Sequence, residues 1–251
     1  MTETGNPPRL TVVIPAYNEE KRILDTLGRV HDHLASQDYT SEILVVDDGS
    51  IDDTLHVVQG FADEHSSVRT LHHEPNRGKG YAVRAGVLSA RGENVLICDA
   101  DLATPIEELD SFWKHLSAGA DIVIASRALA DSRLVQRQPP YREFAGRMFN
   151  FLVQVLAVPG IHDTQCGFKL VRGEVGRHVF ALCTLNGFSF DIEMLHIALR
   201  LGYRIAEVPV AWYHRPGSKV RMLRDGPAML MDLLRMRVRH ARVKRSTCSE
   251  G

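Results

Sequence analysis

Apolar runs and helical spacings alternate along the first half of the chain. The run 10–14 predicts a strand, and apolar residues at 23, 27, 30 and 34 recur on one face of a predicted helix. The succession continues with strands predicted over 42–46, 68–71, 93–98 and 121–125, and with helices over 54–61, 80–90 and from 105 onward. Repeated strand–helix units with nearly continuous apolar strands predict an α/β fold, in which helices cover both faces of a mostly parallel sheet.

The pattern changes after Arg127. Pro139-Pro140 precede a helical pattern over 144–156, a polar loop follows over 160–169, and the chain closes with a helix over 190–201, a strand over 204–210 and a helix from Pro227. Neither an internal repeat nor an interdomain linker is evident. We therefore expect a disordered N-terminus over 1–9, one domain over 10–226, a basic amphipathic helix over 227–245 and a tail over 246–251.

Composition narrows the class of protein only slightly. The 251 residues are 44% hydrophobic and 24% charged with a net charge of −1, which argues against disorder and against nucleic acid as the general partner. The four cysteines lack Cys-x-x-Cys spacing, so neither a zinc site nor a disulfide framework is expected. With no signal-peptide pattern and no apolar stretch long enough to span a bilayer, we expect a cytoplasmic protein, soluble or peripheral on a membrane.

Two carboxylates stand directly after the predicted strand 93–98. Asp99 and Asp101 are one residue apart, so in an extended segment both side chains point the same way. Hard cations such as Mg²⁺ and Mn²⁺ take carboxylate oxygens and bridge them to substrate phosphates. The pair therefore favours a metal–diphosphate site, although the same residues can terminate a strand before a helix capped by Thr104, with Pro105 in its first turn.

Three further polar segments follow predicted strands. Residues 15–20 read Pro-Ala-Tyr-Asn-Glu-Glu, which suits contacts to a base and a ribose or, alternatively, a helix start capped by Asn18. Asp47-Asp48-Gly49-Ser50 offers a carboxylate for a base N–H, or an Asx-type turn. Asn76-Arg77-Gly78-Lys79-Gly80 can cradle phosphate at a helix start, or form a solvated basic loop.

Taken in chain order, from Pro15 to Asp101, these four segments resemble those of the family 2 glycosyltransferases. Members of that family have the GT-A fold, a Rossmann-like nucleotide-diphospho-sugar transferase fold. The resemblance extends to Ala125-Ser126-Arg127, to Asp163 through Lys169, to Phe190-Asp191-Ile192-Glu193 and to Gly217-Ser218-Lys219. These segments are similar to the dolichyl-phosphate β-glucosyltransferase branch and to the related mannose synthases. The likeness covers roughly residues 10–240, and ordered motifs in register are a specific signal.

The resemblance implies roles for individual positions. Contacts to the nucleoside would come from Pro15, Tyr17, Glu19, Asp47 and Asp48, and Lys79 would lie near the nucleotide. Asp99 and Asp101 would hold Mg²⁺ or Mn²⁺ on the diphosphate. Phosphates of the donor or acceptor would meet Arg127, Ser218 and Lys219, beneath a loop in which Gln165 and Lys169 face the acceptor. Ala103 stands where mannose synthases of this type carry a metal-holding Gln, so the metal coordination must differ.

The implied reaction transfers glucose from UDP-glucose to a polyprenyl (dolichyl-type) phosphate with inversion at the anomeric carbon. A phosphate acceptor is already anionic near neutral pH, so it requires cations more than a base. A sugar-hydroxyl acceptor would need a carboxylate base, for which Asp191 and Glu193 are candidates, unless they are simply acidic residues in a first helical turn.

Several other functions compete with this interpretation. A GDP-mannose donor would keep the chemistry and change the substrate. A nucleotidyltransferase should carry a Gly-rich loop where this chain has Pro15-Ala16-Tyr17-Asn18, and intact Asp99 and Asp101 argue against a non-catalytic scaffold that binds nucleotide sugars.

The C-terminal segment combines an apolar stripe with basic residues. Nine Lys and Arg stand between 219 and 245 against only two Asp. A basic amphipathic helix can lie on an anionic membrane surface. Alternatively, the same stripe docks on the domain and leaves the arginines in solvent.

Overall fold

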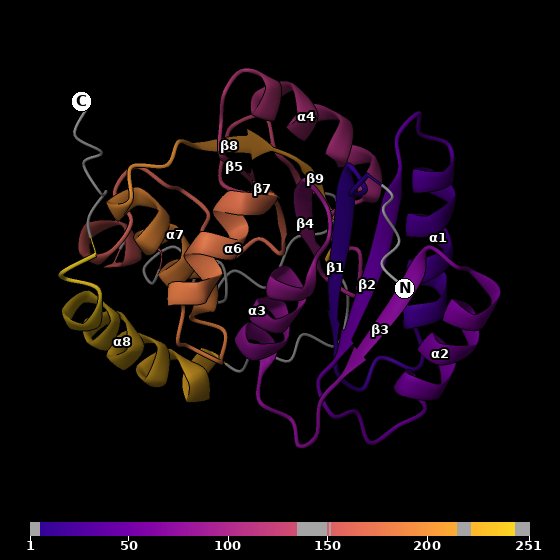
Figure 1. Ribbon diagram of the computed structural model, residues 1–251. Coiled ribbons are helices and arrows are strands. Elements are labelled where there is room, and N and C mark those ends of the chain that lie inside the picture. The colour runs from indigo at the N-terminus through magenta and orange to yellow at the C-terminus, as the bar shows by residue number, and fades with distance from the viewer. Residues whose placement is uncertain (1–5, 135–149, 151, 215–221, 244–251) are drawn as a thin grey trace.

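The central feature of the computed structural model is a seven-stranded sheet in the order β3-β2-β1-β4-β7-β5-β8 with helices on both faces (Figure 1). Residues 6–134, 150, 152–214 and 222–243 are described. The strands are β1 (Leu10–Ala16), β2 (Ser41–Asp47), β3 (Val68–His72), β4 (Asn94–Cys98), β5 (Ile122–Ser126), β6 (Arg133–Leu134), β7 (Phe168–Arg172), β8 (Ile205–Pro209) and β9 (Ala211–Trp212). The helices are α1 (Ile23–Ala35), α2 (Thr54–Glu64), α3 (Lys79–Ser89), the 3₁₀ turn η1 (Ile106–Glu108), α4 (Leu109–Ser117), α6 (Gly173–Leu182), α7 (Phe190–Arg200) and α8 (Met222–Arg239).

Two apolar cores lie on opposite faces of this sheet. Helices α1, α2 and α4 pack over one face, where Leu27 and Phe112 meet the strand residue Val12. Helices α3, α6, α7 and α8 pack over the other face, where Val83 meets Val13. Neighbouring residues of one strand point to opposite faces, so the apolar runs of the central strands fill both cores. The predicted sheet with helices on both faces is confirmed.

Strand β7 is the main departure from the predicted architecture. It lies between β4 and β5 and is antiparallel to both. The sequence pattern placed residues 160–169 in a loop and assigned nothing to residues 170–182, which contain the rest of β7 and α6. In the structure Lys169 is fully buried with the rest of the strand, and its charge is matched by a buried carboxylate described below.

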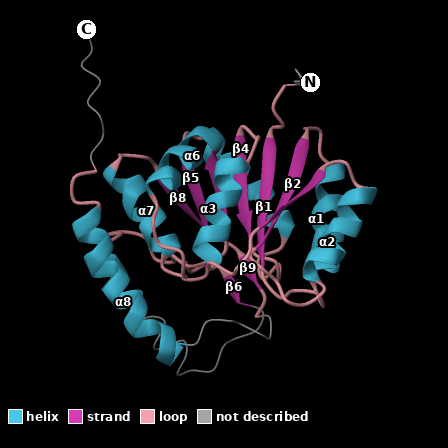
Figure 2. Cartoon of the chain, turned by 60° about the horizontal axis from the view of Figure 1, so that its bottom comes forward, coloured by secondary structure: helices cyan, strands magenta, loops and turns pink. Residues whose placement is uncertain are grey.

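The carboxyl ends of the parallel strands and the amino end of β7 lie at one edge of the sheet. The two-stranded β6–β9 ribbon lies beyond this edge, below the sheet in Figure 2. In open α/β sheets ligands bind beyond the carboxyl ends of the strands. The residues after β1, β2, β4 and β5 are therefore brought together as predicted.

Both ends of the described chain differ from the predicted boundaries. Helix α8 begins at Met222, five residues before the predicted start at 227. It ends at Arg239, six residues before the predicted end at 245. Of the N-terminal stretch predicted to be disordered, Pro8 accepts a hydrogen bond from the Glu93 N–H (2.9 Å). The Arg9 guanidinium lies over the rings of Tyr39 and Trp113, at 5.1 and 5.0 Å from their centroids. These contacts hold residues 8 and 9 in place.

Candidate active site

The loops that follow β1 and β2 are bonded to each other. The Asn18 N–H donates to Ser50 Oγ (2.9 Å), the Ile51 N–H donates to Asn18 Oδ1 (2.9 Å), and the Glu19 N–H donates to Thr54 Oγ1 (2.7 Å). Asn18 adopts a left-handed φ of 51°, a conformation that Asn tolerates better than most residues. Asn18 therefore joins two loops, and it does not cap α1, which begins at Ile23.

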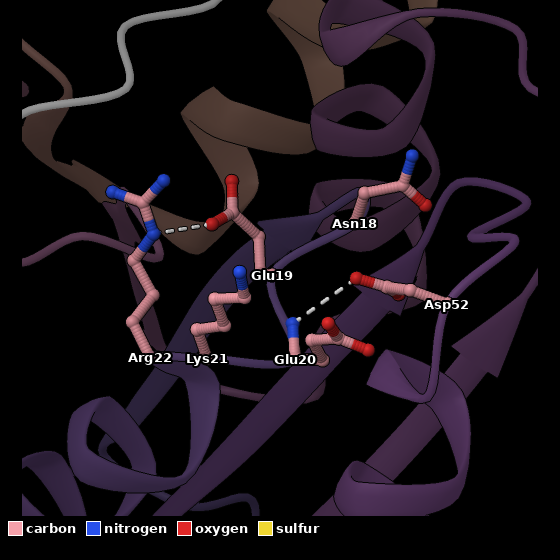
Figure 3. A pocket seen from close by; sticks show the side chains of 6 residues that line it. All are labelled: Asn18, Glu19, Glu20, Lys21, Arg22 and Asp52. Atoms are coloured by element: carbon pink, nitrogen blue, oxygen red, sulfur yellow. Dashed lines mark hydrogen bonds and ion pairs between the residues drawn. The ribbon is translucent and has the colours of Figure 1, made fainter.

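An open pocket of about 290 Å³ lies on these bonded loops, lined by Asn18, Glu19, Glu20, Lys21, Arg22 and Asp52 (Figure 3). Glu19 and Arg22 form an ion pair across it (2.5 Å), and the Glu20 N–H donates to Asp52 Oδ2 (3.3 Å). The lining is entirely polar or charged. Such a surface suits the polar edges of a nucleoside better than an apolar ligand.

Asp48 holds the loop that leads into α3. Its Oδ1 accepts the Arg77 N–H (3.0 Å), and its Oδ2 accepts the Gly78 N–H (2.7 Å) and Asn76 Nδ2 (2.9 Å). Burial raises the pKa of Asp48, and the two backbone N–H groups oppose that shift. Both oxygens of this carboxylate accept hydrogen bonds from the loop, so Asp48 holds residues 76–78 in place.

Three backbone N–H groups of the same loop, which the sequence suggested can cradle phosphate, are bonded within the protein. Besides the two N–H groups that bond Asp48, the Gly80 N–H donates to Asn186 O (2.7 Å). Gly78 has a φ of 104°, and a Cβ there would stand 2.5 Å from the same Asn186 oxygen. The loop is therefore packed against residues 186–187, and Lys79 is its candidate for a charged contact.

Asp47 and Pro15 are buried at the ends of their strands. Asp47 Oδ2 lies 2.8 Å from His72 Nδ1 and accepts the Ser50 N–H (3.3 Å). Pro15 pairs with Val46 inside the sheet and is buried along with the rest of β1. Neither side chain reaches solvent here, so both shape the loops around the pocket.

Asp99 and Asp101 lie on a tight turn after β4. The Leu102 N–H donates to Asp99 O (3.1 Å), and the Ala103 N–H donates to Asp101 Oδ1 (3.0 Å). Leu102 has a φ of 45°, which is strained for a residue with a branched side chain and costs roughly 1–3 kcal/mol. Burial and the charge of Asp99 both raise the pKa of Asp101. The two carboxylates are therefore held close enough to repel each other.

Thr104 does not cap a helix, as the alternative interpretation of this segment required. Its hydroxyl lies 3.5 Å from Cys166 Sγ, and the turn η1 that follows has no side-chain cap.

Lys79 and Gly167 both contact Asp99. The Lys79 ammonium lies 2.6 Å from Asp99 Oδ1, and its pKa is raised by the charges of Asp99 and Asp191 against the opposing effect of burial. Gly167 accepts the Asp99 N–H (3.2 Å), and a Cβ on Gly167 would overlap the Asp99 carboxylate. The Asp99 carboxylate is thus held between the Lys79 ammonium and the backbone of Gly167.

A second ion pair lies behind the first. Lys169 on β7 and Asp191 in the first turn of α7 are both buried, with 2.7 Å between Lys169 Nζ and Asp191 Oδ1. Lys169 also donates to Cys166 O (2.5 Å). The predicted role of Lys169 as a contact of the acceptor is contradicted by its complete burial. A Lys inside an apolar run was the sequence signal for this pair, but its partner 22 positions away was not predictable from spacing.

Glu193, the other candidate base, is a structural residue. It is fully buried and accepts the Thr184 N–H (2.8 Å), the Thr184 hydroxyl (2.9 Å) and the Leu185 N–H (2.8 Å). His240 Nε2 also lies 2.8 Å from Glu193 Oε1. With both oxygens bonded inside the protein, Glu193 has no access to a substrate.

The guanidinium of Arg127 forms a two-point contact with the carboxylate of Asp163. Its Nε and Nη2 donate to Asp163 (2.7 and 2.9 Å), as does its backbone N–H (2.9 Å). Arg127 and hydrogen bonds from it keep the pKa of Asp163 low despite its burial. The Gln165 N–H donates to the same carboxylate (3.2 Å), so Arg127 fixes the loop that carries Gln165. Ser218 and Lys219, the remaining predicted phosphate contacts, lie outside the described residues.

The family of this chain follows from a sequence comparison that agrees with this geometry. Residues 11–180, more than half of the chain, match the family model of glycosyl transferase family 2. The chain belongs to this family of glycosyltransferases. Its matched region contains the bonded loops after β1 and β2, Lys79, Asp99, Asp101, Arg127 and Lys169.

Named relatives cover most of this glycosyltransferase. A dolichyl-phosphate β-glucosyltransferase from Trichomonas vaginalis is 40% identical over 222 residues, which are 84% of this chain and 66% of the relative. The mouse dolichyl-phosphate β-glucosyltransferase is 38% identical over 245 residues, 92% of this chain and 76% of the relative. The transferase thus spans about two thirds to three quarters of the length of these relatives.

The fold has a solved counterpart. Glucosyl-3-phosphoglycerate synthase from Mycobacterium tuberculosis, solved with Mn²⁺, UDP and glucosyl-3-phosphoglycerate, superposes with a TM-score of 0.68 at 22% identity, over 96% of this chain and 82% of the other. The transferase has the GT-A fold, as the sequence predicted. No helix within the described segments is long and apolar enough to cross a membrane.

The donor atoms at Asp99 and Asp101 fit a divalent cation shared with a substrate. In the described part of the transferase, no group of three or more His, Cys, Asp and Glu side chains could hold a metal ion by itself. Mg²⁺ in nucleotide sites is commonly held by one or two carboxylates, with substrate phosphates and waters completing its shell. Two mutually repelling carboxylates are also stabilised by a cation between them. The chain's own donors therefore suit a metal that arrives with a diphosphate.

Replacement of Asp48 by Asn should loosen the loop over 76–78. One carboxylate oxygen becomes an NH₂ group that faces backbone donors, so we expect a loss of about 1–3 kcal/mol in the free energy of unfolding, together with weaker binding of the donor nucleotide. Denaturant titration and calorimetric titration with UDP measure the two effects. Asp32→Asn, at a carboxylate 86% exposed, is the control and should change neither. Unchanged stability and affinity in Asp48→Asn would contradict this role.

Proposed function

We propose that the enzyme transfers glucose from UDP-glucose to the phosphate of a dolichyl-type polyprenol, with inversion at the anomeric carbon. The observation that carries the choice of a phosphate acceptor is the state of the two candidate bases. Asp191 is buried in an ion pair and Glu193 is fully bonded inside the protein. A sugar hydroxyl needs a base within hydrogen-bond reach, whereas an anionic phosphate does not.

The names of the relatives support the same assignment. The Trichomonas and mouse relatives are dolichyl-phosphate β-glucosyltransferases, and they align along most of this chain. We assign glucose as the transferred sugar on this basis and UDP as its carrier.

We assign the donor nucleoside to the polar pocket on the bonded loops. Tyr17 and Glu19 are the proposed contacts, because both belong to the loop that borders the pocket. Pro15, Asp47 and Asp48 are proposed to support these contacts from beneath. They are buried or bonded to the loops that would surround the nucleoside. A site whose side chains are fixed before binding loses less conformational entropy when the donor enters.

Asp99 and Asp101 are the proposed ligands of Mg²⁺ or Mn²⁺. When bound, such a cation neutralises the charge that develops on the departing nucleoside diphosphate. Lys79 is placed to assist there, because its ammonium already lies against Asp99. Asp191 and Lys169 are positioning residues, since their buried pair stands behind Lys79 and adds to the electrostatic environment of Asp99.

The acceptor phosphate is assigned to the side of the site that carries Arg127 and Gln165. Arg127 uses Nε and Nη2 on Asp163, and the remaining guanidinium donors are available to an anion. Ser218 and Lys219 remain proposed phosphate contacts from the sequence motif alone. The lipid nature of the acceptor requires that the enzyme act at a membrane surface.

A panel of donors and acceptors tests this proposal. With Mn²⁺ or Mg²⁺ present, labelled UDP-glucose and a polyprenyl phosphate should give labelled lipid, and EDTA should stop the reaction. We expect GDP-mannose and UDP-galactose to be turned over at least about tenfold more slowly, as one misplaced polar contact costs roughly 1.4 kcal/mol or more. Turnover of another donor, or transfer to a sugar hydroxyl in place of the lipid phosphate, would overturn the assignment.

A further inference from the structure

Helix α8 buries one apolar face against the domain. Met229, Leu233 and Met236 are 7%, 0% and 1% exposed, and Leu233 and Met236 belong to the core that also contains α7. Hydrogen bonds fix the helix in this orientation: Ser189 Oγ donates to Asp232 (2.9 Å), and His240 Nε2 contacts Glu193. The side of α8 that faces away from the domain is therefore well defined (Figures 1 and 2).

A second apolar stripe runs along that outer side. Leu230, Met231, Leu234 and Val238 are 38%, 49%, 49% and 80% exposed. Successive residues of a helix are rotated by about 100°, so these four fall in a sector of roughly 100° opposite the buried face. An amphipathic helix that only docks on its own domain needs one apolar stripe. The outer stripe is not explained by packing within the chain.

Exposed arginines border the outer stripe on both sides. On the same helical projection Arg237 lies along one edge and Arg235 along the other, and Arg242 follows in the turn after the helix; all three are exposed. Asp232 is the one acidic side chain between 228 and 243, and it points toward Ser189 on the docked side. The outer side of α8 is thus apolar at its centre and positive at its margins.

We propose that this outer stripe of α8 inserts into the headgroup region of an anionic membrane. An apolar centre with basic margins is the pattern of helices that lie in the plane of a bilayer, where arginines reach the lipid phosphates and apolar side chains pass below them. A second copy of the chain is a poorer occupant. In a two-fold interface the arginine margins of two helices would face each other, and like charges would oppose association.

The position of α8 connects this surface to the reaction. Ser189, which holds Asp232 of α8, precedes α7 directly and lies two residues before Asp191. Insertion of the outer stripe would therefore hold the amino end of α7, which carries Asp191, close to the bilayer. The link to the reaction rests on the proposed function, whereas membrane binding by α8 depends only on the exposure and charge of its outer side.

Vesicle flotation of the full chain tests the inference without any turnover. We expect binding to phosphatidylcholine vesicles that contain phosphatidylglycerol and little binding to phosphatidylcholine alone. Leu234→Gln/Val238→Gln should lower the partition coefficient by about tenfold or more, because two apolar side chains leave the interface. Arg235→Gln/Arg242→Gln should remove most of the preference for anionic vesicles. Leu24→Gln/Leu88→Gln, at exposed apolar residues on α1 and α3, is the matched control and should bind like the parent protein.

Three results would overturn the inference. These are no binding of the parent protein to anionic vesicles, equal binding by Leu234→Gln/Val238→Gln, and a dimer in sedimentation analysis that this variant converts to monomer without any vesicle binding. Circular dichroism confirms that the variants fold.

A turnover measurement separates the inference from the proposed function. With a water-soluble short-chain prenyl phosphate, Leu234→Gln/Val238→Gln should match the parent protein, whereas transfer to a long-chain acceptor in vesicles should fall. If no prenyl phosphate is glycosylated by any variant, the proposed function fails and flotation still decides the role of α8.

Discussion

Asp101→Asn is expected to lower turnover by about a thousand-fold, equivalent to roughly 4 kcal/mol of transition-state stabilisation. The substitution keeps the shape of the side chain and removes one of the two carboxylate charges that we assign to the metal. The Ala103 N–H, bonded to Asp101 Oδ1 at 3.0 Å, can still donate to the amide oxygen of Asn. The turn and its neighbours should therefore remain folded, so that the loss falls on chemistry and metal affinity.

Calorimetric titration with Mn²⁺ and UDP supplies a readout that does not depend on turnover. We expect Asp101→Asn to weaken the binding of Mn²⁺ in the presence of UDP and to change the melting temperature little. Asp121→Asn is a matched control, because Asp121 Oδ2 also accepts a backbone N–H, that of Arg204 (2.8 Å), at the opposite end of β5. Full activity or unchanged Mn²⁺ binding in Asp101→Asn would remove the metal role from this residue.

The placement of Asp101 illustrates which features are predictable from the sequence. An apolar strand followed by two carboxylates is a local pattern, and the alternation of strands and helices places such patterns at one sheet edge. For this reason the elements up to β5 and the grouping of Asp47, Asp99 and Arg127 at that edge follow from the sequence alone. Local signals were sufficient wherever burial and periodicity agreed.

The sequence failed where a polar residue is buried by a distant partner. Residues 160–169 were interpreted as a loop, which included the first two residues of β7, whereas Lys169 lies in a buried strand because Asp191 of α7 matches its charge. Glu193 was predicted as a candidate base for a sugar-hydroxyl acceptor or, alternatively, as an acidic residue in a first helical turn, but its carboxylate is bonded by residues 184–185 and His240. Such pairings depend on tertiary contacts that no spacing rule encodes.

The same limit applies to glycines and to aspartates on loops. The sequence indicated that Gly167 permits a close approach of the backbone, but only the structure identifies the Asp99 carboxylate as the group that approaches. Asp48 was predicted to contact a base, and the structure adds that it holds the loop over 76–78. In both cases the type of residue was informative, whereas its partner was not.

Lys169→Met should destabilise the protein by about 3–5 kcal/mol at neutral pH, because it leaves the Asp191 carboxylate buried without its cation. The side chains of Lys169 and Asp191 are 1% and 6% exposed, so solvent screens this loss very little. Lys79 contributes a second, weaker attraction to Asp191. Denaturant unfolding measures the loss, and Lys169→Met/Asp191→Leu should recover a large part of it by removing the unpaired charge.

The penalty in Lys169→Met should also depend on pH in a direction that identifies Asp191. Burial already raises the pKa of Asp191, and loss of the Lys169 charge raises it further. A carboxyl whose pKa is higher in the folded state favours folding below its unfolded pKa of about 3.9, and this contribution is lost as pH rises through the folded value. The variant should therefore lose stability relative to the parent as pH increases above about 4. Lys169→Met/Asp191→Leu should show no such dependence, since neither charge is present. Equal stability of Lys169→Met and the parent at all pH values would mean that Asp191 is solvated, and the ion pair behind Lys79 and Asp99 would then have no positioning role.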